Sequence, residues 1–154
     1  MRADKYLEQV KNNDSKVDNM RDEERELWAI ATSMTQNMSG MPHGSGDNDK
    51  MTDIVKKIMD ARDRTNAQID KYVTIKQDVI RHIEMLPRKQ YDVLYWLYVK
   101  KRDKREKGQR WYYTWSEVAD NLGCSEENIR KTRRRAIKNL QKILDSEERL
   151  LEVE

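Results

Sequence analysis

The chain has 154 residues, of which 38% are charged and 36% hydrophobic, with no Phe, two Pro and five Gly. So few hydrophobic residues exclude one thick core, and so many charges exclude a membrane span. One Cys and two His exclude a disulfide framework and a zinc site of four Cys/His ligands within one chain. Few helix breakers among many Lys, Arg, Glu, Asp and Gln residues predict an all-α fold of long helices with solvated outer faces.

Residues 1–86 are expected to form two long helices. From about residue 3 to 35, apolar residues recur at helical spacing in a narrow stripe. From about residue 50 to 86, Ile58, Thr65, Tyr72, Val79 and Leu86 follow one another at intervals of seven. Gly, Pro, Ser, Asn and Asp residues predict a mobile loop at about 36–49. We therefore expect a coiled-coil-like antiparallel hairpin that serves as an assembly arm or spacer and forms a homo-oligomer.

Charge is unevenly distributed along the chain. From Lys100 to Lys142 there are 14 Lys and Arg residues against 6 Asp and Glu, a net charge of +8, so the rest of the chain carries −5 of the total +3. A basic segment on an acidic body is typical of a nucleic-acid-binding protein. Eight of the 11 Tyr and Trp residues lie in or just before this segment, which places the compact core in the C-terminal half.

Residues 87–154 are expected to form a second, DNA-binding domain. Pro87 predicts the start of a new helix, and residues from Tyr91 to Tyr98 give this helix a strongly apolar, aromatic face. The basic stretch 100–113 has two interpretations that the sequence leaves open. It is either a basic wing that contacts phosphates or a longer, solvated helix end.

Residues 114–144 have the spacing of a helix-turn-helix. Ala119 is small, as close crossing of two helices requires, and Gly123 is suited to the positive φ of a tight turn. Ile129 is expected to pack the second helix, at about 126–144, onto the first. Ser125 is a suitable N-cap of that second helix. The structural residues of the motif are Val118, Ala119, Leu122, Gly123 and Ile129.

The second helix is predicted to be the DNA-recognition helix. Its exposed face should be polar and basic, while Ile129, Ala136, Leu140 and Ile143 should be buried. A basic helix after such a turn is the ordinary means of entering a major groove, with its first turns at base edges and its later cations at phosphates. The alternative is a helical corner in a bundle whose Arg residues are merely solvated.

The stretch WSEVADNLGCSEENIRKTRRRAIKNL resembles DNA-binding region 4 of sigma factors, in which an aromatic-x-E-apolar-A helix precedes G-x-S and a recognition helix. Ala136, Ile137 and Leu140 match the end of that motif. The opening YLEQV and the stretch HGSGDNDKMTDIVKKIMD extend the likeness over nearly the full length. Over this length the chain resembles phage-encoded, sigma-region-4-like transcriptional regulators of the ArpU/RinA type. About a dozen residues around 100–113 are extra relative to the sigma module.

This resemblance implies sequence-specific regulation of phage or prophage genes, most often late genes, on double-stranded DNA and beside host RNA polymerase in the nucleoid of the bacterial cytoplasm. Carried over residue by residue, base contacts would come from Glu126, Glu127, Asn128 and Lys131. Contacts with or near phosphates would come from Arg130, Arg134, Arg135 and Lys138. No part of the chain resembles the promoter-melting region of a sigma factor.

The same residues are compatible with two other functions. A small-terminase-like subunit for phage DNA packaging also joins a helix-turn-helix to oligomerising helices, and a polymerase-binding adaptor would use the Tyr91–Tyr98 face. No Ser/His/Asp arrangement, phosphate-binding Gly loop or carboxylate pair is recognisable, so we expect neither an enzyme nor a metal or cofactor site. His82 is expected to be a satisfied or solvent-facing helix residue. No apolar run follows the first charges, so we expect no signal peptide and no membrane partner.

Overall fold

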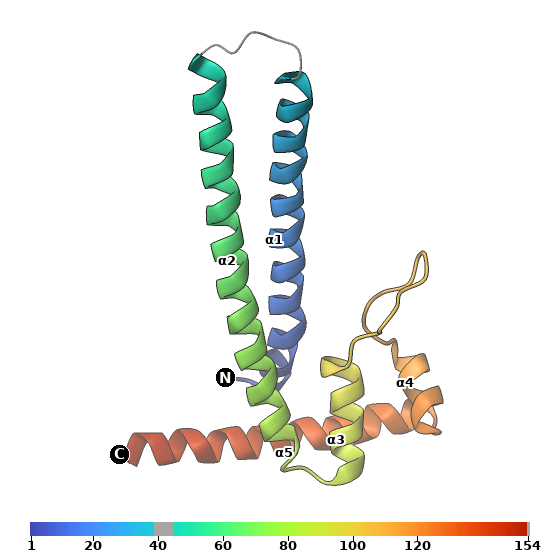
Figure 1. Ribbon diagram of the computed structural model, residues 1–154. Helices are drawn as coiled ribbons and strands as arrows, with labels where there is room; N and C mark the ends of the chain where they lie inside the picture. Colours follow the sequence, from blue (N-terminus) through green and yellow to red (C-terminus); the bar gives the residue numbers. More distant parts are fainter. Residues whose placement is uncertain (39–44, 154) are drawn as a thin grey trace. The chain divides into compact units, whose positions relative to one another are not determined.

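The computed structural model describes the backbone of residues 1–38 and 45–153 and the side chains of residues 1–35 and 49–153. Over these residues the protein is all-α, as predicted. Its elements are α1 (Ala3–Met38), α2 (Ser45–Ile83), α3 (Arg88–Leu94), the π-helical turn η1 (Tyr95–Val99), α4 (Trp115–Leu122) and α5 (Glu126–Val153) (Figure 1). None of the described helices is long and apolar enough to cross a membrane.

Four predicted boundaries were wrong. α1 continues to Met38 and α2 starts at Ser45, so both ends of the predicted loop 36–49 are helical, while residues 39–44 lie outside the described residues. α2 ends at Ile83 instead of Leu86. α5 reaches Val153 instead of ending near residue 144, because residues 145–153 contain neither Gly nor Pro to stop a helix.

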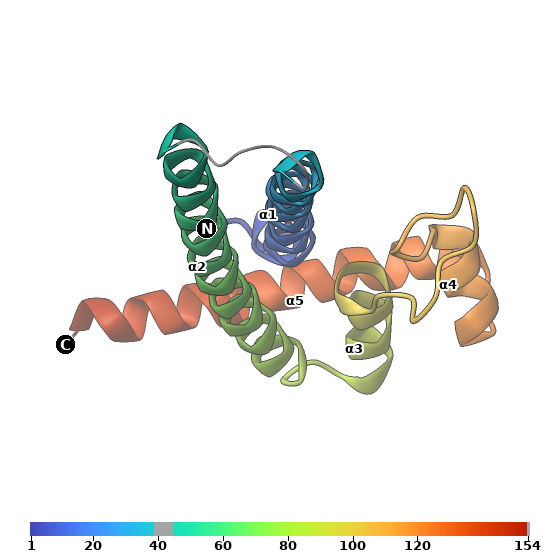
Figure 2. The same ribbon diagram turned by 45° about the horizontal axis from the view of Figure 1, so that its top comes forward.

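The chain forms two compact units, one of residues 13–73 and one that combines residues 1–12 with residues 74–154. The first contains the greater part of α1 and α2, which lie side by side and run in opposite directions (Figures 1 and 2). Ala31 of α1 packs with Ile54 and Ile58 of α2, and a few partly buried residues cover this cluster: Leu27, Met34 and Met51. Two helices alone bury little apolar surface, so this unit has a thin hydrophobic core.

The larger unit has a thicker core, which the ends of the long helices share with the C-terminal elements. Its largest fully buried side chains are Leu7, Val10, Val79, Ile83, Leu94, Val99, Val118, Ile129 and Leu140. Both α3 and α4 pack against α5. The start of α1 and the end of α2 therefore belong to the unit of the C-terminal elements and not with the rest of their own helices.

A buried polar network joins α1, α2 and α5 in this larger unit. His82 is only 3% exposed. Its Nε2 lies 2.6 Å from the Glu147 carboxylate, and its Nδ1 lies 2.7 Å from the Tyr6 hydroxyl and 2.8 Å from the backbone oxygen of Asp78. Tyr6 donates to the Asp78 carboxylate at 2.5 Å, and Arg81 donates to both carboxylates. The prediction that His82 is a satisfied helix residue is confirmed.

The network shifts the titration of its acids. Partial burial raises the pKa of Asp78, but hydrogen bonds from Tyr6 and Arg81 outweigh it and leave this pKa below its usual value. The hydrogen bond with His82 is the largest influence on Glu147 and lowers its pKa. Burial and the neighbouring Asp78 raise the pKa of Tyr6, so its hydroxyl remains a donor. The carboxylates are therefore stabilised in their charged form by folding.

We predict that the protein loses stability as the pH falls through the acidic range. Lowered folded-state pKa values mean that the stabilisation is complete above the unfolded carboxyl values, about 4, and is lost as the pH falls through the folded-state values. Glu147→Gln should flatten this dependence, measured by urea unfolding between neutral and acidic pH. Glu152→Gln, at an exposed position of the same helix, should leave it unchanged. Equal pH profiles for wild type and Glu147→Gln would contradict the assignment.

Candidate nucleic-acid interface

Helix α4 begins with a capping box. The Glu117 N–H donates to Thr114 Oγ1 at 3.3 Å, and the Thr114 N–H donates to the Glu117 carboxylate at 3.2 Å. Arg102 forms an ion pair with the same carboxylate, and this hydrogen bond is the main cause of the low pKa of Glu117. The T-x-x-E signal of a capping box is present in the sequence at 114–117.

The turn between α4 and α5 follows the predicted chemistry. Gly123 has φ 68° and ψ 35°, in the left-handed region that favours glycine. The Cys124 N–H donates to the Ala119 carbonyl at 3.0 Å, which closes the end of α4. Ser125 Oγ accepts the Asn128 N–H at 3.2 Å, as an N-cap of α5 should. The predicted roles of Gly123 and Ser125 are confirmed.

The inner side of α5 is apolar and packs against α3 and α4. Ile129, Ala136 and Leu140 have no exposed surface, and Val118 and Ala119 of α4 are buried as well. Leu122 is half-buried, and so is Ile143, which was predicted to be buried. Ile143 lies about one turn beyond Leu140 along α5.

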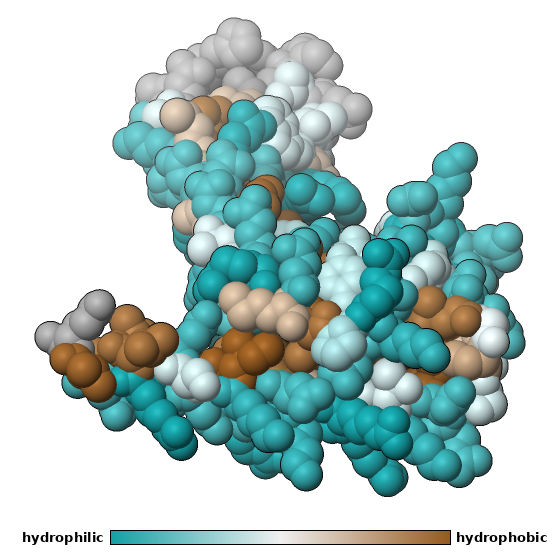
Figure 3. Space-filling model, turned by 90° about the horizontal axis from the view of Figure 1, so that it is seen from below, coloured by the Kyte–Doolittle hydropathy of each residue, from teal (hydrophilic) through white to brown (hydrophobic). Residues whose placement is uncertain are grey.

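The outer side of α5 carries all eight residues proposed for DNA contact. Each is exposed: Glu126, Glu127, Asn128, Arg130, Lys131, Arg134, Arg135 and Lys138. Since an α-helix has 3.6 residues per turn, the positions from 127 onward share the broad arc opposite the buried stripe. Seen from below, the surface is largely hydrophilic, with hydrophobic patches at the left of the view, near its middle and towards its right (Figure 3).

The first turns of α5 form a shallow hollow that is lined by two acidic and three basic side chains. Its lining residues are Glu126, Glu127, Arg130, Lys131 and Arg134. Lys131 Nζ lies 3.4 Å from the Glu127 carboxylate, and both side chains are mostly exposed. Asn128, Arg135 and Lys138 are not part of this lining. The hollow therefore presents hydrogen-bond donors and acceptors side by side. The edges of base pairs also carry both kinds of group.

Arg133 does not share the outer face, although it stands in a run of three arginines. Its Nε donates to the Tyr98 hydroxyl at 2.7 Å, and its guanidinium lies 5.4 Å from the centre of the Trp115 ring. Tyr98 is 8% exposed, and burial raises its pKa against the influence of Arg133. Arg133 thus joins α5 to η1 and α4 and is not available as a solvated cation.

Residues 100–113 form a loop, so the interpretation as a longer helix end is wrong. The helical segment ends at Val99, since Lys100 is extended with φ −71° and ψ 127°. The last helical residues, Leu97, Tyr98 and Val99, are buried. The two arms of the loop meet where the Arg102 N–H donates to the Trp111 carbonyl at 2.8 Å. Arg102 lies over the Tyr113 ring at 4.5 Å, and Arg105 over the Trp111 ring at 5.2 Å. Cation–π contacts therefore order both arms.

The aromatic face proposed for a polymerase adaptor is divided by the fold. Tyr91 and Tyr95 are partly exposed and stack with their ring centres 5.6 Å apart. Tyr98 instead faces the core and Arg133. The run from Tyr91 to Tyr98 is therefore not one continuous exposed surface.

Comparisons with protein-family models, with curated proteins and with solved structures found no match to this chain. Among the described residues, His, Cys, Asp and Glu side chains nowhere gather in threes that could hold a metal ion. The chemistry available on the outer face of α5 is thus that of polar and charged side chains on a fixed helix.

We predict unequal losses of stability for two neighbouring arginines. Arg133→Ala should lower the free energy of unfolding by about 1.5–3 kcal/mol, because a charge-assisted hydrogen bond with a buried partner is lost. Arg134→Ala, which removes an exposed side chain on the outer face, should change it by no more than about 0.5 kcal/mol. Urea unfolding at neutral pH measures both. Equal stabilities of the two variants would contradict the inward role of Arg133.

Proposed function

We propose that the protein is a sequence-specific DNA-binding transcriptional regulator that uses α4, the turn at Gly123 and α5 as a helix-turn-helix. The observation that carries this proposal is the outer face of α5, where exposed cations and amide-bearing or acidic side chains follow a rigid, capped turn. Such a helix has the width and chemistry to enter a major groove.

The residues divide by their position along α5. Glu126, Glu127, Asn128 and Lys131 lie in its first two turns and would meet base edges. Lys and Asn side chains suit guanine and adenine, and carboxylates accept from the cytosine amino group. Cations at the edges of the helix and further along it would meet phosphates: Arg130, Arg134, Arg135 and Lys138.

The likeness to sigma region 4 supports a role in transcription of phage or prophage genes, in the cytoplasm and beside host RNA polymerase. Within this proposal, the antiparallel α1–α2 hairpin is the part that assembles copies of the protein. Its thin core and its distance in sequence from the α4–α5 motif favour assembly over DNA contact.

The direct test is selection of duplex DNA from a random pool by the purified protein, followed by footprinting at physiological salt. A protein of this kind should enrich one motif and protect it at concentrations that leave random DNA unprotected. Recovery of no enriched motif would overturn the proposal.

We predict that Lys131→Ala and Arg135→Ala will weaken DNA binding in different ways. Lys131→Ala should cost roughly 1–3 kcal/mol on the selected sequence and relax base preference, since a base contact is lost. Arg135→Ala should weaken selected and random duplexes about equally and flatten the salt dependence by about one unit of slope, since a phosphate contact is lost.

Titrations of both duplexes at several salt concentrations measure these effects. Lys71→Ala, which removes an exposed cation of α2, is the matched control and should change neither. Equal losses on selected and random DNA for Lys131→Ala would exclude its role at a base.

A further inference from the structure

One side of the unit 13–73 carries a stripe of apolar side chains along α2. Val55, Met59 and Val73 are 46%, 61% and 42% exposed, and Ile69 is half-buried. At 3.6 residues per turn these four positions lie within about 80° of one another around the helix, beside the stripe that packs on α1. Met59 is thus among the most exposed large hydrophobic residues of the described chain.

Residues of α1 widen this apolar stripe. Arg62, which stands on the same side of α2, lies 6.0 Å from the centre of the Trp28 ring and donates to Glu24 at 3.3 Å. Trp28 is itself 48% exposed. The surface defined by Trp28 with Val55, Met59, Ile69 and Val73 is called the α2 stripe below.

We propose that the α2 stripe binds the same stripe of a second copy, with the two α2 helices antiparallel and the two-fold axis near residue 64. An isologous interface requires a surface that is complementary to itself, so that residue i meets j and j meets i. The α2 stripe meets this requirement because its residues are symmetric about position 64. Val55 would face Val73 of the partner subunit, Met59 would face Ile69 of the partner subunit, and Arg62 would face Asn66 of the partner subunit.

The charges beside the stripe fit the same arrangement. Lys56 and Asp70 lie along one edge of it and are exposed. In the antiparallel pair, Lys56 comes close to Asp70 of the partner subunit, and Asp70 comes close to Lys56 of the partner subunit. In a parallel pair, each of these charges would instead lie beside the identical residue of the partner subunit, and the repulsion between like charges would be unfavourable. Charge complementarity therefore selects a second copy in the antiparallel direction.

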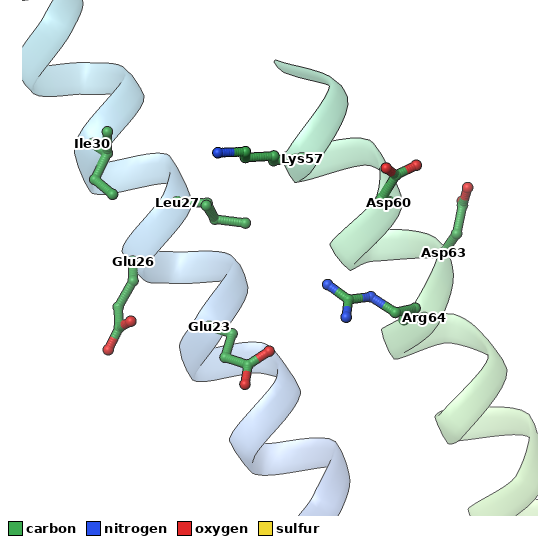
Figure 4. A pocket seen from close by; sticks show the side chains of 8 residues that line it. All are labelled: Glu23, Glu26, Leu27, Ile30, Lys57, Asp60, Asp63 and Arg64. Carbon is green, nitrogen blue, oxygen red and sulfur yellow. The ribbon is translucent and has the colours of Figure 1, made fainter. Parts of the chain in front are cut away.

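The opposite side of the unit is less suited to such packing. There a groove between α1 and α2 is lined by Leu27 and Ile30 together with six charged residues: Glu23, Glu26, Lys57, Asp60, Asp63 and Arg64. Lys57 and Arg64 reach from α2 towards α1, across from Leu27 and Glu23 (Figure 4). Charges at this density keep the groove solvated. The second copy would complete a four-helix bundle on the stripe side and supply the core that two helices lack.

This inference extends the assembly role proposed above and does not depend on DNA binding. Sedimentation equilibrium of the full chain should give a dimer at micromolar concentration. Met59→Glu should raise the dimer dissociation constant by about 30-fold or more, because it places a charge in the centre of the interface. Ile30→Glu, 49% exposed on the groove side, is the matched control and should leave the dimer intact.

Thiol cross-linking tests the direction and register of the pair. Val55→Cys and Val73→Cys are made separately in a Cys124→Ser background, which removes the native thiol. A short bis-maleimide should join the two variants when they are mixed, and should give no dimer with either variant alone. Val55→Cys that cross-links to itself would overturn the antiparallel arrangement.

Three further results would overturn the proposal. These are a monomer at about 100 µM, a closed ring of many copies, and a dimer as sensitive to Ile30→Glu as to Met59→Glu. The ring would favour the packaging alternative over a regulator without bearing on whether the protein binds DNA. DNA selection tests that separately, so failure of the dimer and failure of DNA binding are distinguishable.

Discussion

The burial of one side of α5 determines most of what the larger unit presents to its surroundings. Ile129, Ala136 and Leu140 lose all their exposed surface against α3 and α4, and each fully buried Ile or Leu side chain contributes about 1.5–3 kcal/mol. Rotating α5 by half a turn would bury Arg134 and Lys138 and expose this stripe, at a large cost. The cationic face is therefore held outward by the apolar packing behind it, and its positions are as rigid as the core.

The cations of this unit fall into two groups, those that contact aromatic rings and those that are exposed to solvent. Lys11, Arg102 and Arg133 lie against the rings of Tyr98, Tyr112, Tyr113 and Trp115, and partial burial lowers the pKa of Lys11. These cations stabilise the junctions between elements. The net charge of the basic segment consequently overstates the number of its cations that are free of aromatic contacts, whereas Arg134, Arg135 and Lys138 remain exposed on the outer face of α5.

The polar network around His82 joins the start of α1 and the end of α2 to α5. The boundary between the two compact units therefore falls within each of the two long helices and not at their ends. Tyr6 at the start of α1, Asp78 and His82 near the end of α2, and Glu147 in the late part of α5 meet through hydrogen bonds of 2.5–2.8 Å. Removing one member would leave buried polar groups without a partner, which is more costly than losing an exposed ion pair. The late part of α5, which the sequence motif did not require, is held by this network.

The sequence by itself determined the helical fold class, the turn at Gly123, the N-cap at Ser125 and the buried stripe of α5, because each depends on neighbours within a few residues or on the helical period. It also separated the eight outward residues of α5 from its apolar ones. Tertiary structure alone decided that Arg133 turns inward, that Tyr98 leaves the aromatic face, that residues 100–113 form a loop and that Glu147 meets His82. These outcomes depend on partners between 15 and 65 residues away in the chain, as with Arg102 and Glu117 or His82 and Glu147. Helical periodicity carries no information about which distant ring or carboxylate will be adjacent, and that adjacency decides whether a given charge is buried or solvated.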